Sequence, residues 1–282
     1  MADGWGHRVV RIDDMTGARW ATFGTLGSGA GQFDHPIGIA VDTSGRIYVA
    51  DLNNHRIVRM DDMTGAGWIT LGRAGSGTHE FNGPGDIFLD AAGRIFIADF
   101  RNHRIVRMDD MTGKDWTTLG TRGTGTNQFL VPVDVFVDTA GRIYVVDEHN
   151  HRILRVDDMR GRGWTALGSQ GSEVNQFNLP HGVHVDAAGW IYVTDTDNHR
   201  IVRMDDMTGA GWTTYGNQGS GAREFNKPAA IFVDAAGQIY VTEWRGHRIV
   251  RMNDMTGVGW VSIGGPGGEP HLFGGTYGLV VA

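Results

Sequence analysis

The chain has no cysteine, so disulfide bonds and thiolate chemistry play no part in its fold or its activity. Its formal net charge is -7, and it lacks the clustered positive charge that attracts nucleic acids and anionic membranes. No apolar run approaches the length of about 18 residues that a transmembrane helix needs. Residues Met1–Trp5 lack the basic and apolar segments of a signal peptide. These absences predict a soluble protein without nucleic-acid or membrane partners, and they leave its compartment open.

What the chain has in abundance is an internal repeat of 48 residues. The segment Asn54–Gly65 returns almost unchanged along the whole sequence. Its histidine recurs as His7, His55, His103, His151, His199 and His247. A tryptophan recurs with the same step as Trp20, Trp68, Trp116, Trp164, Trp212 and Trp260. A constant period of this size is typical of repeat architectures, and it predicts one closed or stacked array.

One repeat, residues 36–83, is predicted to contain four short strands. The predicted strands are residues 37–42, 46–51, 55–60 and 68–71, followed by a loop rich in glycine and serine. The first two are apolar at nearly every position, so both of their faces need cover, which neighbouring blades of a ring provide. Glycine is abundant, with 44 residues, and suits the tight turns between such strands. The predicted fold class is therefore all-β, a six-bladed β-propeller with four antiparallel strands per blade.

The ring does not divide into six complete repeats. Complete units begin at Pro36, Pro84, Pro132, Pro180 and Pro228. The remaining pieces, residues 1–24 and 276–282, are predicted to form a sixth blade that closes the single domain, residues 1–282, non-covalently. Its second strand is nearly missing, since only Met1–Asp3 match that strand. Either the blade is defective or the chain is cut from a longer array, which we favour because Met1 stands where the next unit has Val49. We therefore expect a gap at the second strand of the sixth blade.

Two motifs in each repeat resemble the NHL repeat. One is Val49–Arg59 with its Asp51, Asn54, His55 and Arg56, preceded by Gly45–Tyr48. The other is the loop Gly75-x-Gly77-x-x-Glu80-Phe81-x-x-Pro84. The resemblance covers essentially the whole chain, and it implies a six-bladed propeller used as a binding or scaffold module. A minority of the family, together with related propellers, are lyases or hydrolases with a metal near the central channel.

The regular spacing of the polar residues favours a structural role for them. Residues 48 positions apart are related by a rotation of one blade, so the histidines lie around a circle. A metal instead needs three or four ligands that converge on one atom. We expect hydrogen-bonded corners between the second and third strands, formed with Asp51, His55, Arg56, His103, His151, His199 and His247. The Asp61-Asp62 pairs lack the spacing of a calcium loop and are expected to cap turns. The repeated tryptophans are expected to pack at the rim.

The differences between repeats gather at two places, the start of the first strand and the turn between the second and third strands. In a propeller both places share one face, around the mouth of the channel. A ligand site is expected there, for a protein, peptide or glycan, although drift at exposed turns produces the same pattern. The candidate ligand-binding residues are Trp5, Phe100, Arg101, Glu148, His149, Trp244, Arg245 and Tyr277. No catalytic residue and no cofactor are expected in this interpretation.

Two alternatives to this non-catalytic binding or scaffold propeller stay open. The first is a metal-dependent lyase or hydrolase in which Asp134, His181 and His184 hold a divalent metal at the channel. Asp134 and His181 occupy nearly equivalent positions of adjacent blades, so a shared ion is sterically feasible. The second is a recently amplified or designed repeat without an evolved ligand, since residues 56–68 and 200–212 are identical.

Overall fold

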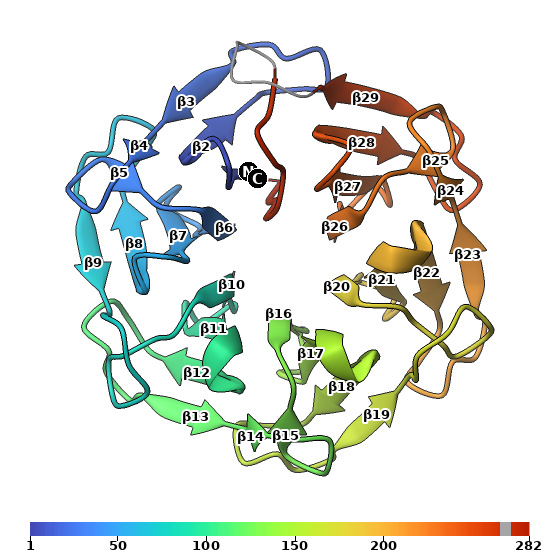
Figure 1. Cartoon of the computed structure of the whole chain (residues 1–282), viewed down its shortest axis with the longest axis horizontal. Helices are drawn as coiled ribbons and strands as arrows, with labels where there is room; N and C mark the ends of the chain where they lie inside the picture. Colours follow the sequence, from blue (N-terminus) through green and yellow to red (C-terminus); the bar gives the residue numbers. More distant parts are fainter. Residues whose placement is uncertain (266–271, 282) are drawn as a thin grey trace.

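A computed structural model describes residues 1–265 and 272–281 of the chain. It confirms the predicted all-β propeller: the sheets stand as six blades in a ring around a central axis (Figure 1). In each continuous blade the strands follow one another from the axis outward, and each pairs antiparallel with the next. None of the described residues forms a helix long and apolar enough to cross a membrane.

Five blades are continuous in sequence. Blade 1 consists of β6 (Pro36–Val41), β7 (Ile47–Asp51), β8 (Arg56–Met60) and β9 (Ile69–Leu71). Blade 2 consists of β10 (Pro84–Leu89), β11 (Ile95–Asp99), β12 (Arg104–Met108) and β13 (Thr117–Leu119). Blade 3 consists of β16 (Pro132–Val137), β17 (Ile143–Asp147), β18 (Arg152–Val156) and β19 (Thr165–Leu167). Blade 4 consists of β20 (Pro180–Val185), β21 (Ile191–Asp195), β22 (Arg200–Met204) and β23 (Thr213–Tyr215). Blade 5 consists of β26 (Pro228–Val233), β27 (Ile239–Glu243), β28 (Arg248–Met252) and β29 (Val261–Gly264).

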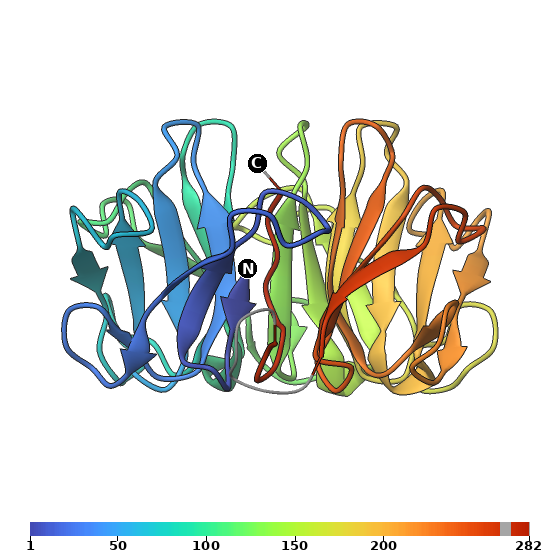
Figure 2. The ribbon, with the colours of Figure 1, turned by 90° about the horizontal axis from the view of Figure 1, so that it is seen from above.

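Blade 6 joins the two ends of the chain, which lie side by side near the axis (Figure 2). The N-terminal piece supplies β1 (Ala2–Asp3), β2 (Arg8–Arg11) and β3 (Ala21–Phe23). The C-terminal piece lies in the place of the first strand: the Ala2 amide donates to Gly278 O at 2.9 Å, and the Tyr277 amide donates to Ala2 O at 3.1 Å. The second strand of this blade has 2 residues, whereas β7 has 5. The ring is thus closed by hydrogen bonds between the ends rather than by a continuous strand.

Two kinds of short element were not predicted from the sequence. The turns between the second and third strands of blades 2, 3 and 4 form 3-10 turns, η1 (Phe100–Asn102), η2 (Glu148–Asn150) and η3 (Thr196–Asn198). Three of the glycine-rich loops contain parallel pairs: β4 (Thr25–Leu26) with β5 (Gln32–Phe33), β14 (Thr121–Arg122) with β15 (Gln128–Phe129), and β24 (Asn217–Gln218) with β25 (Glu224–Phe225). The loop folds back on itself because its phenylalanine is fully buried, as Phe33, Phe129 and Phe225 show with 0% exposure.

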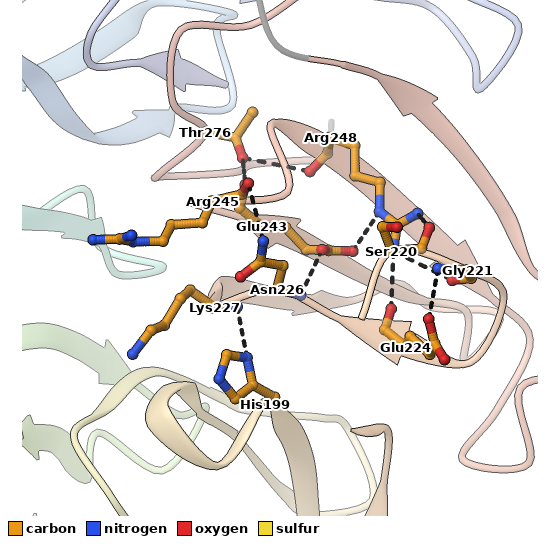
Figure 3. A network of polar contacts seen from close by, with 10 residues as sticks. All are labelled: His199, Ser220, Gly221, Glu224, Asn226, Lys227, Glu243, Arg245, Arg248 and Thr276. Carbon is orange, nitrogen blue, oxygen red and sulfur yellow. Dashed lines mark hydrogen bonds and ion pairs between the residues drawn. The ribbon is translucent and has the colours of Figure 1, made fainter. Parts of the chain in front are cut away.

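A buried acid at the end of each second strand organises the corner of its blade. In blade 1, Asp51 Oδ1 accepts the amide of Asp34 at 2.7 Å, and Oδ2 accepts Asn54 Nδ2 and Arg56 Nε, both at 2.8 Å. The Arg56 guanidinium then donates to backbone carbonyls of the preceding loop, among them Ser28 O at 2.6 Å. The acid and the arginine together fix the loop to the blade. Figure 3 shows the same arrangement in blade 5, where Glu243 replaces the aspartate and pairs with Arg248 at 2.6 Å.

Five of the six repeated histidines, all but His247, connect their blade to the next one. His55 adopts a left-handed backbone conformation, with φ 53°, and its Nδ1 accepts the amide of Gly83 at 3.1 Å. Gly83 immediately precedes β10, so the bond links blade 1 to blade 2. The contact recurs as His103 with the Val131 amide and His151 with the Leu179 amide, at 3.2 and 3.1 Å. Because the ring nitrogen accepts a hydrogen bond, the imidazole must be neutral.

Candidate functional site

The variable segments of the repeats lie together on one face of the ring. Each turn between the second and third strands is hydrogen-bonded to the residues that precede the first strand of its blade. Examples are the amide of Glu148 with Val131 O at 3.2 Å and the amide of Trp244 with Lys227 O at 2.8 Å. Both variable places therefore surround one mouth of the channel, and Figure 1 shows them gathered about the axis.

Tyr277 lies at the centre of this mouth and contacts residues from several blades. Its ring packs against His35 at 5.2 Å, Trp244 at 6.2 Å and His181 at 6.3 Å between ring centroids. Its hydroxyl is hydrogen-bonded to Trp5 and Trp244. The side chain is only 7% exposed, and this burial raises the pKa of the Tyr277 phenol. Tyr277 thus closes the channel at this end, with the other aromatic residues arranged around it.

The outer part of the cluster is accessible to a ligand. Trp5 is 58% exposed and packs edge-to-face on His35 at 4.8 Å. The guanidinium of Arg245 stacks on Trp244 at 5.3 Å. Large aromatic side chains and arginine are the residue types that dominate binding energy at interfaces. The mouth therefore presents a surface with the composition of a binding site.

A second arginine and its aromatic neighbour lie on blade 2, opposite blade 5. Arg101 stacks on the ring of Phe100 at 5.0 Å, as Arg245 does on Trp244. Both arginines are exposed, so they border the mouth rather than fill it. The structure thus brings the predicted residues of blades 2, 5 and 6 to one rim.

Blade 3 adds an acid to the rim at Glu148, the first residue of η2. Burial, with a smaller contribution from the Asp197 carboxylate, raises the pKa of Glu148 to about 8. Asp197 itself forms an ion pair with Lys227, whereas the next residue of η2, His149, is exposed. Glu148 and Tyr277 interact electrostatically although blades 3 and 6 lie opposite each other in the ring. Both side chains must therefore reach toward the axis.

Below the mouth, two carboxyl groups face each other inside the channel. Asp86 of β10 and Asp134 of β16 are hydrogen-bonded to one another, and burial raises the pKa of both. The Asp134 carboxylate raises the pKa of Asp86 further, because two adjacent carboxylates cannot both ionise at low cost. Asp134 Oδ2 accepts the Val183 amide at 2.7 Å. Asp86 therefore carries the proton of the pair.

Four rings from blades 2 to 5 form an aromatic belt along the channel next to this pair. Phe88 packs on Phe136, Phe136 on His184 and His184 on Phe232, with ring centroids 4.8, 4.8 and 4.9 Å apart. Burial lowers the pKa of His184 to about 4, so the ring is neutral at pH 7. The belt was not recognised from the sequence, although residues 88, 136, 184 and 232 follow the same 48-residue step. Comparing aligned repeats position by position would have revealed it.

The alternative metal ligands Asp134, His181 and His184 do not form a cluster among the described residues. Among residues 1–265 and 272–281, no three His, Asp or Glu side chains lie together so that they could hold a metal ion. The three candidates lie at different depths and have other partners: His181 packs on Tyr277 at the mouth, His184 lies in the aromatic belt, and Asp134 pairs with Asp86. Burial also lowers the pKa of His181 to about 4.

The hydroxyl of Tyr277 is expected to stabilise the closed mouth. Tyr277→Phe removes the acceptor of both indole N–H groups, so the free energy of unfolding should fall by about 1 kcal/mol in urea titrations. Tyr215→Phe is the matched control, because the Tyr215 hydroxyl is buried and has no hydrogen-bond partner among the described residues. Its removal should leave stability unchanged or raise it. Equal losses in the two variants would contradict the role given to the Tyr277 hydroxyl.

Comparisons with known proteins concern the repeats and the fold. The NHL repeat family model matches residues 33–60, 81–108, 129–155 and 177–204. No curated protein matches the chain. A solved chain from a nidogen–laminin complex is similar at a TM-score of 0.70 and 20% identity, over 90% of this chain and 88% of that chain. A catalytically inactive virginiamycin B lyase from Staphylococcus aureus with quinupristin gives a TM-score of 0.61 and 15% identity, over 88% and 74%. A streptogramin B lyase gives 0.60 and 13%, over 93% and 74%. At these identities the likeness is one of fold.

Proposed function

Because this chain is an NHL-repeat protein folded as a six-bladed propeller, we propose that it is a binding module that holds a peptide segment of a partner protein over Tyr277. The observation that carries the proposal is the convergence of the residues in which the repeats differ. Trp5 and Tyr277, from opposite ends of the chain in blade 6, and Trp244 of blade 5 form one hydrogen-bonded aromatic cluster. Elsewhere the repeats maintain the corners and the links between blades.

The composition of the mouth suits a peptide better than a small apolar molecule. Aromatic faces and stacked guanidinium groups supply contact area with little loss of side-chain entropy on binding. Tyr277 closes the channel at this end, so the ligand lies across the mouth rather than inside the channel. The similar fold found in a nidogen–laminin complex supports the view that such a propeller can serve protein binding.

Selection from a random dodecapeptide library tests this proposal. Peptides enriched on the wild-type protein should bind the double variant Trp5→Ala/Trp244→Ala at least about tenfold more weakly, because these residues supply the exposed aromatic surface of the mouth. Binding is measured by fluorescence anisotropy of labelled peptides.

Trp190→Ala serves as the control for that selection. Trp190 is 40% exposed and follows the turn between the first and second strands of blade 4, away from the mouth. Its loss should leave the affinity of the enriched peptides unchanged. The proposal fails when no peptide distinguishes the mouth variant from this control.

A further inference from the structure

Resting on the proposed function, we propose that the mouth receives one protonated amine or guanidinium group of the ligand, held between Glu148 and the Tyr277 aromatic cluster. Among the described residues, Glu148 has no hydrogen-bond or ion-pair partner, and it interacts electrostatically with Tyr277 of the aromatic cluster. Three observations carry the inference: the partners of Glu148, its position relative to the cluster, and the placement of the nearby arginines.

Glu148 is an acid for which the described residues supply no partner. The equivalent position of the other repeats holds no acid. The equivalent residues are Leu52, Phe100, Thr196 and Trp244. Within the described part of the chain, no hydrogen bond or ion pair reaches the Glu148 carboxyl group, which interacts electrostatically with Asp197 and Tyr277. The Glu148 side chain is half-buried, and a carboxylate that has lost part of its water is costly unless it is paired or protonated. An external cation would supply the missing partner.

The aromatic groups that face Glu148 across the mouth also favour a cation. Trp5, Trp244 and Tyr277 present aromatic rings, whose faces attract ammonium and guanidinium groups by their quadrupoles. Glu148 on blade 3 is close enough to Tyr277 on blade 6 to interact with it electrostatically. A cation between them would contact a carboxylate on one side and aromatic rings on the other.

The arginines of the rim restrict the kind of basic ligand. Arg101 and Arg245 lie on blades 2 and 5, stacked on Phe100 and Trp244. They would repel a ligand with many positive charges, while the centre of the mouth offers one carboxyl group. The favoured ligand is therefore a peptide with one lysine, arginine or amino terminus, flanked by neutral or acidic residues.

Binding of a cation at this place is coupled to release of a proton. With a pKa of about 8, the empty Glu148 carboxyl group is protonated at pH 7, whereas a bound cation favours the carboxylate. Affinity should therefore rise with pH, on the order of 100-fold between pH 6 and pH 9, and level off above the pKa. Among the groups near Glu148, Asp197 is paired with Lys227. His181 stays neutral because burial lowers its pKa to about 4, and Tyr277 stays protonated because burial raises its pKa.

Glu148→Gln tests the inference on the peptides selected with the wild-type protein. The enriched peptides should carry a lysine or arginine. Glu148→Gln should lower their affinity at least tenfold at pH 8 and abolish the rise in affinity with pH, measured by isothermal titration from pH 6 to pH 9. Glutamine closely matches the protonated acid, so the fold should be retained, which circular dichroism checks. Glu173→Gln changes the same charge at an exposed loop position and should bind as the wild type does.

The outcomes separate this inference from the proposed function. The pH dependence must also persist in His149→Gln, because His149 is the exposed titratable neighbour on the same turn. Peptides that need Trp5 and Trp244 but lack a basic residue, or that bind Glu148→Gln equally well, overturn the cation site and leave the binding module standing. The absence of any peptide that depends on the mouth overturns both.

Discussion

Replacing Asp99 by alanine should lower the free energy of unfolding by about 3–5 kcal/mol, because it leaves a half-buried guanidinium group without its counter-charge. Asp99 is 0% exposed, and its carboxylate accepts the amide of Asn82, the side chain of Asn102 and Arg104 Nε, each at 2.8 Å. The Arg104 side chain is 11% exposed, so water cannot replace the lost partner fully. Urea unfolding followed by circular dichroism measures the change.

Asp61→Ala is the matched control, since Asp61 also pairs with an arginine but at the surface. The pair with Arg59 has an N–O distance of 3.1 Å, and the Asp61 side chain is 49% exposed. A pair of this kind contributes about 0.5 kcal/mol. Similar losses in Asp99→Ala and Asp61→Ala would show that the corner is not a principal support of the blade.

Replacing His184 by phenylalanine should make the protein less sensitive to acid. The folded protein holds His184 neutral, with a pKa of about 4, whereas the unfolded chain binds a proton near the ordinary value of 6.5. The stability that depends on the neutral ring is present above pH 6.5 and is lost as the pH falls toward 4. Between pH 7 and pH 5 the wild type should therefore lose about 2 kcal/mol relative to His184→Phe.

Parallel urea titrations of the two proteins at pH 7 and pH 5 measure this difference. All other titrating groups are shared, and the constant loss of the His184 hydrogen bond to Val233 cancels between the two pH values. The reciprocal variant Phe136→His places a second imidazole in the belt and should add acid sensitivity. If the wild type and His184→Phe lose the same free energy of unfolding between pH 7 and pH 5, His184 is solvated in the folded protein.

The 48-residue period predicted the architecture because each repeat needs its neighbours to cover its strands. Strands such as Ile47–Asp51 are buried at every position, and this requirement is visible in their unbroken apolar sequence. The same period also identified the variable residues at the mouth, because these are the positions at which the repeats differ. Periodicity places a residue on a face, however, and does not show what it touches there.

The contacts at the centre of the channel could not be predicted for that reason. Side chains from opposite blades meet at the axis, so the partners of Tyr277 and Glu148 depend on how far each one reaches. The alternative metal site shows the same limit: Asp134 and His181 occupy nearly equivalent positions of adjacent blades, yet Asp134 pairs with Asp86 and His181 packs on Tyr277. A register irregularity between Pro180 and Val183 separates the start of β20 from its regular part, and the rings of His181 and His184 have different partners.

The contacts of Asp3 give the ring a defined order of assembly and a defined place of opening. Among the described residues, His247 Nδ1 has no partner, and the amide that its equivalents would bind, that of Gly275, donates instead to Asp3 Oδ1 at 3.0 Å. Gly274 donates to the same oxygen at 2.9 Å, across 271 positions of the chain. Contacts between such distant segments cost more loop-closure entropy than the contacts inside a blade, so they form after the blades have folded. The amides of Gly274 and Gly275 should accordingly exchange with solvent deuterium earlier than their counterparts in the other blades, by opening of the seam without unfolding of the blades.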